Sequence, residues 1–167
     1  YAILEVGKEW MKGGLTSEEI NEEVAELLGL EYETVMEAFI TECSSMNISQ
    51  KILDLIQELR GTYTVVITTN HMDCMERWII PAHNLLDYVD GVVNSYNEGV
   101  MKVENGGEFF KVVFETYGGR PEDSIVIDDS RDVLDLFESL GGVSYQATSE
   151  TPLMYWLKKI KDSLSAR

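Results

Sequence analysis

The feature that most constrains the fold is an alternation of short strand-like runs with helix-like runs after Gly61. Four runs are rich in the β-branched and aromatic residues that favour strands. They are TYTVVITTN (62–70), GVVNS (91–95), SIVIDD (124–129) and VSYQAT (143–148). Strands that alternate with helices predict right-handed βαβ units and a parallel sheet with helices on both faces. We therefore expect an α/β fold, Rossmann-like, with an open and mostly parallel sheet flanked by helices.

The helix-like runs between these strands have recognisable ends. MDCMERWII (72–80) is expected to stop at Pro81, and the runs at 107–119 and 131–142 end in glycines. A last helix should begin at Thr151 and Pro152, because proline is favoured in a first helical turn.

The first 60 residues or so predict helices. Thr16 and Glu19 form a capping-box pattern ahead of an apolar helical face, and Gly29 ends that run. The opening run YAILEVGKEWMK (1–12) is ambiguous, because its apolar spacing suits a helix while YAILEV alone could be a short strand.

Composition narrows the possible partners. The 167 residues carry a formal charge of −17, from 13 Lys and Arg against 30 Asp and Glu. This balance disfavours nucleic acid and an anionic membrane surface, both of which need clustered positive charge. Cys43 and Cys74 have no disulfide-framework or zinc-site spacing, so we expect a cytoplasmic protein in a reducing compartment. No apolar run is long enough for a membrane span.

Polar residues gather where the predicted strands end. Ligands of open parallel sheets bind beyond the carboxyl ends of the strands, which meet at one edge. The residues expected at that edge are Thr68, Thr69, Asn70, Asn94, Ser95, Lys102, Asp128 and Asp129. Two adjacent aspartates suit Mg²⁺, which prefers one or two carboxylates together with waters and phosphate oxygens. Hydroxyl, amide and ammonium groups suit a phosphate.

Three segments carry a resemblance to a known family. VVITTN, NSYNEGVMK and IVIDDS, in that order, are similar to the second, third and fourth motifs of the haloacid dehalogenase-like (HAD) hydrolase superfamily. The resemblance covers about residues 50–145. It implies a small helical cap at residues 1–50, which could be partial, and a HAD-like core at residues 51–167.

The resemblance also implies a mechanism. In the family, an aspartate at the end of the first strand attacks phosphorus and forms an aspartyl-phosphate. Here Thr69 would be a catalytic residue that holds a phosphoryl oxygen, with Asn70 beside it. Lys102 would be catalytic and neutralise the nucleophile and the phosphoryl group, and Asp128 and Asp129 would hold Mg²⁺. The expected substrate is a small phosphorylated metabolite, whose identity the sequence leaves open, as it does the oligomeric state.

The aspartate pair that begins the family's first motif (DxD) is absent from the sequence. No aspartate precedes Asp54, which lies within a helix-like run. Three explanations remain. The chain could be a fragment that lacks the first strand; it could be degenerate, with YAILEV as that strand and Glu5 near the nucleophile position; or it could be a catalytically inactive HAD-like binding module, or one completed by another chain.

Two further residues near the predicted site have weaker signals. His71 follows Asn70 closely enough to touch a substrate, although a helix-start residue facing solvent is the simpler interpretation. Cys74 has no base paired with it in the sequence, which argues against a nucleophilic role.

Overall fold

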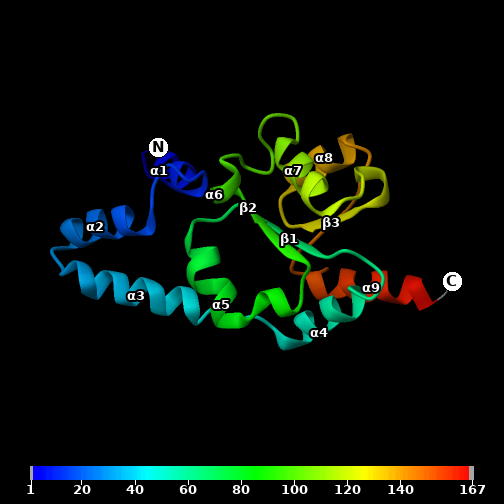
Figure 1. The fold of residues 1–167 in the computed structure, drawn as a ribbon, viewed down its shortest axis with the longest axis horizontal. Helices are drawn as coiled ribbons and strands as arrows, with labels where there is room; N and C mark the ends of the chain where they lie inside the picture. Colours follow the sequence, from blue (N-terminus) through cyan, green and yellow to red (C-terminus); the bar gives the residue numbers. More distant parts are fainter. Residues whose placement is uncertain (1, 166–167) are drawn as a thin grey trace. The chain divides into compact units, whose positions relative to one another are not determined.

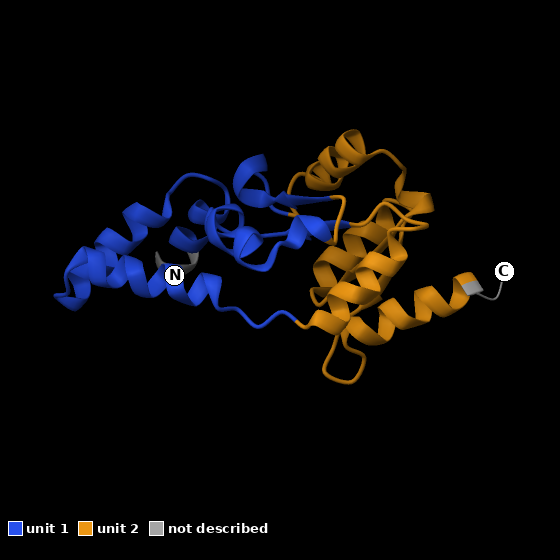
Figure 2. Cartoon of the chain, turned by 60° about the horizontal axis from the view of Figure 1, so that its bottom comes forward, with its two compact units in different colours: residues 1–48, 66–87, 91–101 blue, residues 49–65, 88–90, 102–167 orange. Residues whose placement is uncertain are grey.

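The computed structural model describes residues 2–165 and divides the chain into two compact units. In Figure 2 the first unit, residues 1–48, 66–87 and 91–101, is blue, and the second, residues 49–65, 88–90 and 102–167, is orange. Both units contain a pair of parallel strands with helices around it (Figure 1).

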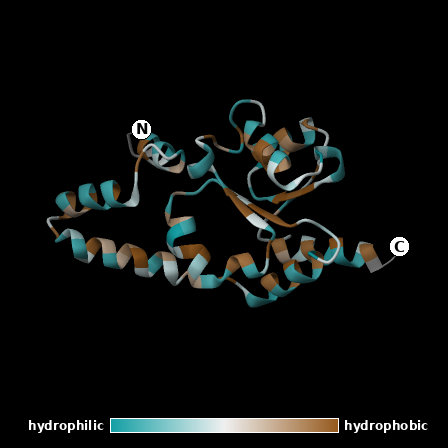
Figure 3. Cartoon of the chain, in the orientation of Figure 1, coloured by the Kyte–Doolittle hydropathy of each residue, from teal (hydrophilic) through white to brown (hydrophobic). Residues whose placement is uncertain are grey.

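The first unit begins with three helices, α1 (Ala2–Met11), α2 (Ser17–Leu28) and α3 (Tyr32–Ser44). The capping box predicted for Thr16 and Glu19 is present at the start of α2. Gly29 ends that helix with φ of 65°, a left-handed conformation that glycine adopts without steric cost. Helices α2 and α3 pack side by side, and hydrophilic and hydrophobic residues alternate along both (Figure 3).

The ambiguous opening run is helical, because α1 covers Ala2–Met11. The alternative in which YAILEV forms the first strand is therefore wrong. Glu5 lies exposed on this helix and is not at the end of a strand. Tertiary contacts decide the ambiguity, because Trp10 is buried at only 9% exposure when this segment is helical.

The strands of the first unit are β1 (Val66–Thr69) and β2 (Gly91–Asn94), which pair in parallel with Val66 opposite Gly91. Between them lie η1 (Met75–Ile79), α5 (Ile80–His83) and η2 (Leu85–Asp87), and after β2 comes α6 (Ser95–Glu98). The expected helix stop at Pro81 is wrong. Pro81 lies in the first turn of α5, where its missing N–H is not needed, so the helical run continues to His83.

The second unit contains α4 (Gln50–Leu59), α7 (Glu108–Tyr117), η3 (Pro121–Asp123), β3 (Ile125–Asp128), α8 (Arg131–Ser139), β4 (Val143–Gln146) and α9 (Leu153–Ser165). Strands β3 and β4 are parallel, with Ile125 opposite Val143, and α8 packs against both. Helix α4 packs against α9 (Figure 1).

Two apolar groups form the core of the second unit. One joins α4 to α9 through Leu55, Leu59, Leu157 and Ile160. The other is aromatic: Phe110 is 2% exposed, and its ring lies 5.0 Å from that of Phe137. Ile127 of β3 packs against the first cluster, and α8, which carries Phe137, packs against the same strand.

The α/β class expected from the sequence is confirmed, since both strand pairs are parallel and flanked by helices. The division into a cap of residues 1–50 and a core of residues 51–167 stays a prediction. No helix within residues 2–165 has the length and hydropathy of a membrane span.

The packing of α9 predicts the effect of one core truncation. Leu157→Ala should destabilise the protein by about 2–5 kcal/mol, because it removes buried methyl groups and leaves a cavity in the cluster with α4. Urea unfolding followed by circular dichroism measures this free energy. Lys158→Ala, an exposed position on the same helix, is the control and should change stability by less than about 0.5 kcal/mol. Equal effects for the two variants would contradict this account of the core.

Candidate active site

Lys102 and Asp128 form a nearly buried ion pair in the second unit. Nζ of Lys102 lies 2.6 Å from Oδ2 of Asp128, and the two side chains are 11% and 10% exposed. Asp128 is the last residue of β3, at the carboxyl end where parallel strands present ligand-binding groups. An ammonium and a carboxylate withdrawn from water are costly unless they are paired, so this contact is specific. Among the predicted site residues, Lys102 and Asp128 are in direct contact.

The second oxygen of Asp128 fixes the start of the next segment. Its Oδ1 accepts a hydrogen bond of 2.9 Å from the backbone N–H of Ser130. Asp129 lies between them with an exposed side chain, and its backbone carbonyl accepts a bond from Gln146. The hydrogen-bonded carboxylate of Asp128 therefore has a solvent-exposed carboxylate, that of Asp129, as its neighbour in the chain.

This donor set suits a hard divalent cation. Oxygen ligands in adjacent positions match Mg²⁺, which usually takes one or two protein carboxylates and completes its shell with waters or phosphate oxygens. A full cage of three or more His, Cys, Asp or Glu side chains does not occur among the residues that the structure describes. Asp128 and Asp129 therefore fit a Mg²⁺ site in which waters or phosphate oxygens supply most of the ligands.

Thr69 and Asn70 lie in the first unit, at and just after the end of β1. The predicted roles of all five residues, Thr69, Asn70, Lys102, Asp128 and Asp129, stay predictions at this point.

Asn94, at the end of β2, holds the chain that follows β1. It is 0% exposed, and its Oδ1 accepts a bond of 3.0 Å from the backbone N–H of His71. Its Nδ2 donates to the carbonyl of Met72 at 3.1 Å and to Glu76 at 3.0 Å. Asn94 therefore fixes the backbone directly beyond Asn70.

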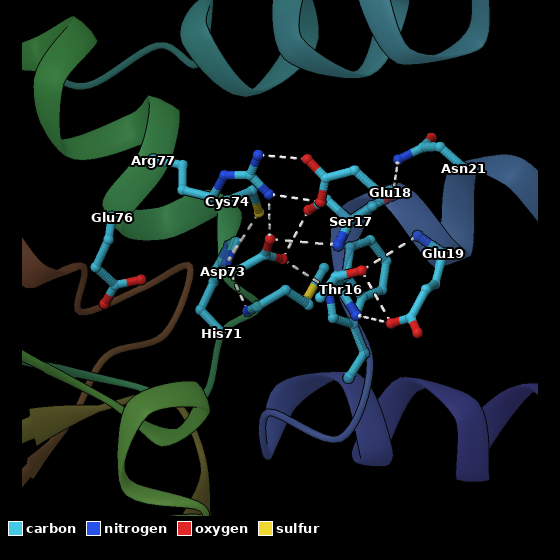
Figure 4. Close-up of polar contacts among 12 residues, drawn as sticks. Thr16, Ser17, Glu18, Glu19, Asn21, His71, Asp73, Cys74, Glu76 and Arg77 are labelled. Carbon is cyan, nitrogen blue, oxygen red and sulfur yellow. Dashed lines mark hydrogen bonds and ion pairs between the residues drawn. The ribbon is translucent and has the colours of Figure 1, made fainter. Parts of the chain in front are cut away.

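A buried carboxylate, Asp73, is the centre of a second polar network (Figure 4). Asp73 is 5% exposed and accepts bonds from Trp10 Nε1 at 2.8 Å and Ser17 Oγ at 2.6 Å. Arg77 donates to it at 2.7 Å and also pairs with Glu18. The network ties α1 and the start of α2 to the segment that follows β1.

The charge state of Asp73 follows from these contacts. Burial alone would raise its pKa, but the hydrogen bonds from Ser17, Trp10 and Arg77 outweigh burial and hold the pKa below the ordinary value of 3.8. Arg77 likewise lowers the pKa of Glu18 through a direct hydrogen bond. Both carboxylates are therefore ionised at neutral pH.

Sequence reasoning missed Asp73 and the bonding role of Asn94. Asp73 lies in a helix-like run with no local motif, and two of its three side-chain donors, Ser17 and Trp10, are 56 and 63 residues away in the chain. Asn94 was placed at the edge of the sheet, but its partners could not be read from spacing. Cys74 is 1% exposed, and burial raises the pKa of its thiol to about 12. Its Sγ lies 3.5 Å from Nδ1 of His71, a neighbouring base that the sequence did not reveal.

Among comparisons with known proteins, only the search of solved structures finds matches to this chain. No protein-family model matches the chain, and no curated protein matches it either. Among solved structures, a HAD family enzyme from Bacteroides thetaiotaomicron, in complex with magnesium and inorganic phosphate, matches with a TM-score of 0.71 and 25% identity. That match covers 84% of this chain and 73% of the enzyme.

Two more distant structures share the fold. A predicted HAD-like family hydrolase from Porphyromonas gingivalis has a TM-score of 0.70 at 24% identity, over 93% of this chain and 77% of that one. A HAD phosphatase from Thermococcus onnurineus has a TM-score of 0.60 at 17% identity, over 86% and 87% of the two chains. The chain therefore has the fold of the HAD-like hydrolase superfamily, which confirms the resemblance drawn from its three motifs. The neighbours support a HAD-like hydrolase.

The Asp73 network predicts a measurable loss of stability. Asp73→Asn should destabilise the protein by about 2–3 kcal/mol at pH 7, because several donors lose a charged acceptor. The folded pKa lies below the unfolded one, so this contribution is complete above about pH 4 and is lost as the pH falls through the folded value.

Unfolding free energies from pH 7 down to pH 3 measure both effects. The difference between the wild type and Asp73→Asn should be largest at pH 7 and shrink in acid. Asp162→Asn, at an exposed position on α9, is the control and should match the wild type. A difference that stays constant with pH would contradict an ionised Asp73.

Proposed function

We propose that the protein is a Mg²⁺-dependent phosphohydrolase that acts on a small phosphorylated metabolite through an aspartyl-phosphate. The observation that carries this proposal is the ion pair of Lys102 and Asp128 at the carboxyl end of β3, with the exposed carboxylate of Asp129 beside it. A buried ammonium beside the carboxyl end of a strand suits a site that binds an anionic phosphoryl group. The neighbour crystallised with magnesium and inorganic phosphate supports the same chemistry.

Each residue has a role in this proposal. Lys102 neutralises charge on the nucleophile and on the phosphoryl oxygens, while Asp128 holds the ammonium in place. Thr69 and Asn70 donate hydrogen bonds to phosphoryl oxygens. Asp128 and Asp129 bind Mg²⁺, which when present polarises the phosphoryl group.

The proposal requires an attacking aspartate, and no aspartate precedes Asp54 in the sequence. Asp54 is exposed in the middle of α4, and Glu5 is exposed on α1. We propose that the nucleophile comes from a segment outside residues 1–167. In the described part of the second unit β3 pairs with β4, and we propose that a strand of this segment pairs with its other edge. A parallel strand there would end beside Lys102 and Asp128.

A catalytically inactive binding module is the second candidate. The specific observation in its favour is that no aspartate precedes Asp54 in the sequence. Such a module would bind a phosphorylated ligand or a protein partner without turnover. Neither candidate function involves nucleic acid or a membrane as a partner. We propose a cytoplasmic location, because Cys43 and Cys74 are buried free thiols.

Removal of the ammonium tests the enzyme directly. In the intact protein, Lys102→Ala should lower kcat/KM for p-nitrophenyl phosphate by at least about a hundredfold, the loss expected when an electrostatic stabiliser of the transition state is removed. Lys111→Ala, an exposed lysine on α7, is the control and should keep wild-type activity. Circular dichroism checks that both variants fold. Full activity in folded Lys102→Ala refutes the proposal, and no activity in the wild type favours the binding module.

The metal assignment gives a separate expectation. Chelation by EDTA should abolish hydrolysis, and added Mg²⁺ should restore it. Asp129→Asn should raise the Mg²⁺ concentration needed for half-maximal activity by about tenfold or more, because an amide oxygen is a weaker ligand for a hard cation than a carboxylate. Asp123→Asn, exposed on η3, is the matched control. Hydrolysis that proceeds unchanged in EDTA contradicts a Mg²⁺ site.

A further inference from the structure

His71 lies where a ligand of the first unit would be contacted. It follows Asn70 and stands two residues beyond Thr69, at the carboxyl end of β1. Its side chain is half-buried. In parallel sheets this end of the strand is the ligand-binding end, so the ring of His71 lies in the region where a substrate is expected.

The backbone of His71 is held rigidly. Its N–H donates to Oδ1 of Asn94 at 3.0 Å, and the next carbonyl, of Met72, accepts from Nδ2 of the same side chain at 3.1 Å. Asn94 is fully buried, so these bonds do not compete with water. The position of the His71 ring is therefore set before any ligand binds.

The proton on the ring is also set. The backbone N–H of Met72 donates to Nδ1 of His71 at 3.0 Å, so Nδ1 is an acceptor. Sγ of Cys74 lies 3.5 Å from the same nitrogen. Figure 4 shows His71 and Cys74 side by side. Because Nδ1 accepts the hydrogen bond from Met72, the proton of the neutral ring lies on Nε2.

The proton on Nε2 is available to a ligand. Among the residues that the structure describes, Nε2 of His71 has no hydrogen-bond partner, and none of the phosphoryl-transfer roles above uses this ring. A donor whose backbone, ring orientation and tautomer are all fixed is the arrangement by which proteins recognise an acceptor atom.

We propose that His71 is a specificity-determining residue that donates a hydrogen bond from Nε2 to an oxygen on the organic part of the substrate. This inference rests on the proposed phosphohydrolase function. His71 lies one residue beyond Thr69 and Asn70, the predicted phosphoryl-binding pair. We therefore assign its Nε2–H to an oxygen of the organic group and not to a phosphoryl oxygen. The substrate class is then a phosphomonoester with a hydroxyl, carbonyl or carboxylate oxygen close to the ester bond.

The tautomer can be measured without turnover. The chain has only His71 and His83, so a long-range ¹H–¹⁵N spectrum of ¹⁵N-histidine-labelled protein shows two rings, and His83→Gln assigns them. We expect the Nε2–H form for His71 at pH 8. A proton on Nδ1 of His71 would overturn the inference.

Specificity is tested with two ligands of matched length, glycerol 1-phosphate and propyl phosphate, on the intact protein with Mg²⁺. The wild type and the control His83→Gln should have a kcat/KM about five- to tenfold higher for glycerol 1-phosphate, the effect of one hydrogen bond. His71→Phe should lose this preference while it still hydrolyses propyl phosphate. His71→Gln, whose amide N–H can replace Nε2–H, should retain it.

The outcomes separate the two proposals. If neither ester is hydrolysed by the wild type, the proposed function fails, and this inference fails with it. If both are hydrolysed and His71→Phe keeps the preference for glycerol 1-phosphate, only the role of His71 is overturned. A uniform loss of activity on both esters, without a change in their ratio, would assign His71 a merely structural role.

Discussion

The ion pair of Lys102 and Asp128 is the contact on which the candidate site depends. Two opposite charges lie 2.6 Å apart with nearly all of their surface removed from water. Desolvation of such a pair costs about as much as the attraction returns, so the pair adds little to net stability. Its value lies in placing a cation and a carboxylate at the end of β3 in one fixed geometry. The proposed chemistry needs that preorganisation.

The first unit fixes its backbone in a similar way, with the neutral amide of Asn94 and the ionised carboxylate of Asp73. Asn94 holds the backbone beyond Asn70, and Asp73 links the next turn to α1 and α2. Rigid surroundings of this sort keep donor groups in position before a ligand arrives, which reduces the entropy lost on binding. The proposed specificity of His71 depends on the Asn94 bonds, because they hold the backbone of His71 and of Met72, whose N–H sets the tautomer of the ring.

Local patterns in the sequence predicted much of the fold. The capping box at Thr16 and Glu19 and the glycine stop at Gly29 are confirmed, because both depend on neighbours within a few residues. Strand β1 is shorter than the run 62–70 suggested. The backbone N–H of Thr62 bonds to Leu59 at the end of α4, which removes the first residues from the strand. Alternation of residue types could not reveal that competing bond.

The order of strands, helices and strand-end residues in the sequence determined the fold class and named Lys102 and Asp128 as members of one site, since parallel strands present their ends at one edge. Only the tertiary structure decided that residues 2–11 are helical, that Asp73 is a buried acceptor and that Nδ1 of His71 is occupied. These outcomes depend on contacts between groups far apart in the chain or on hydrogen-bond geometry. The spacing of residue types along the sequence does not reveal such contacts.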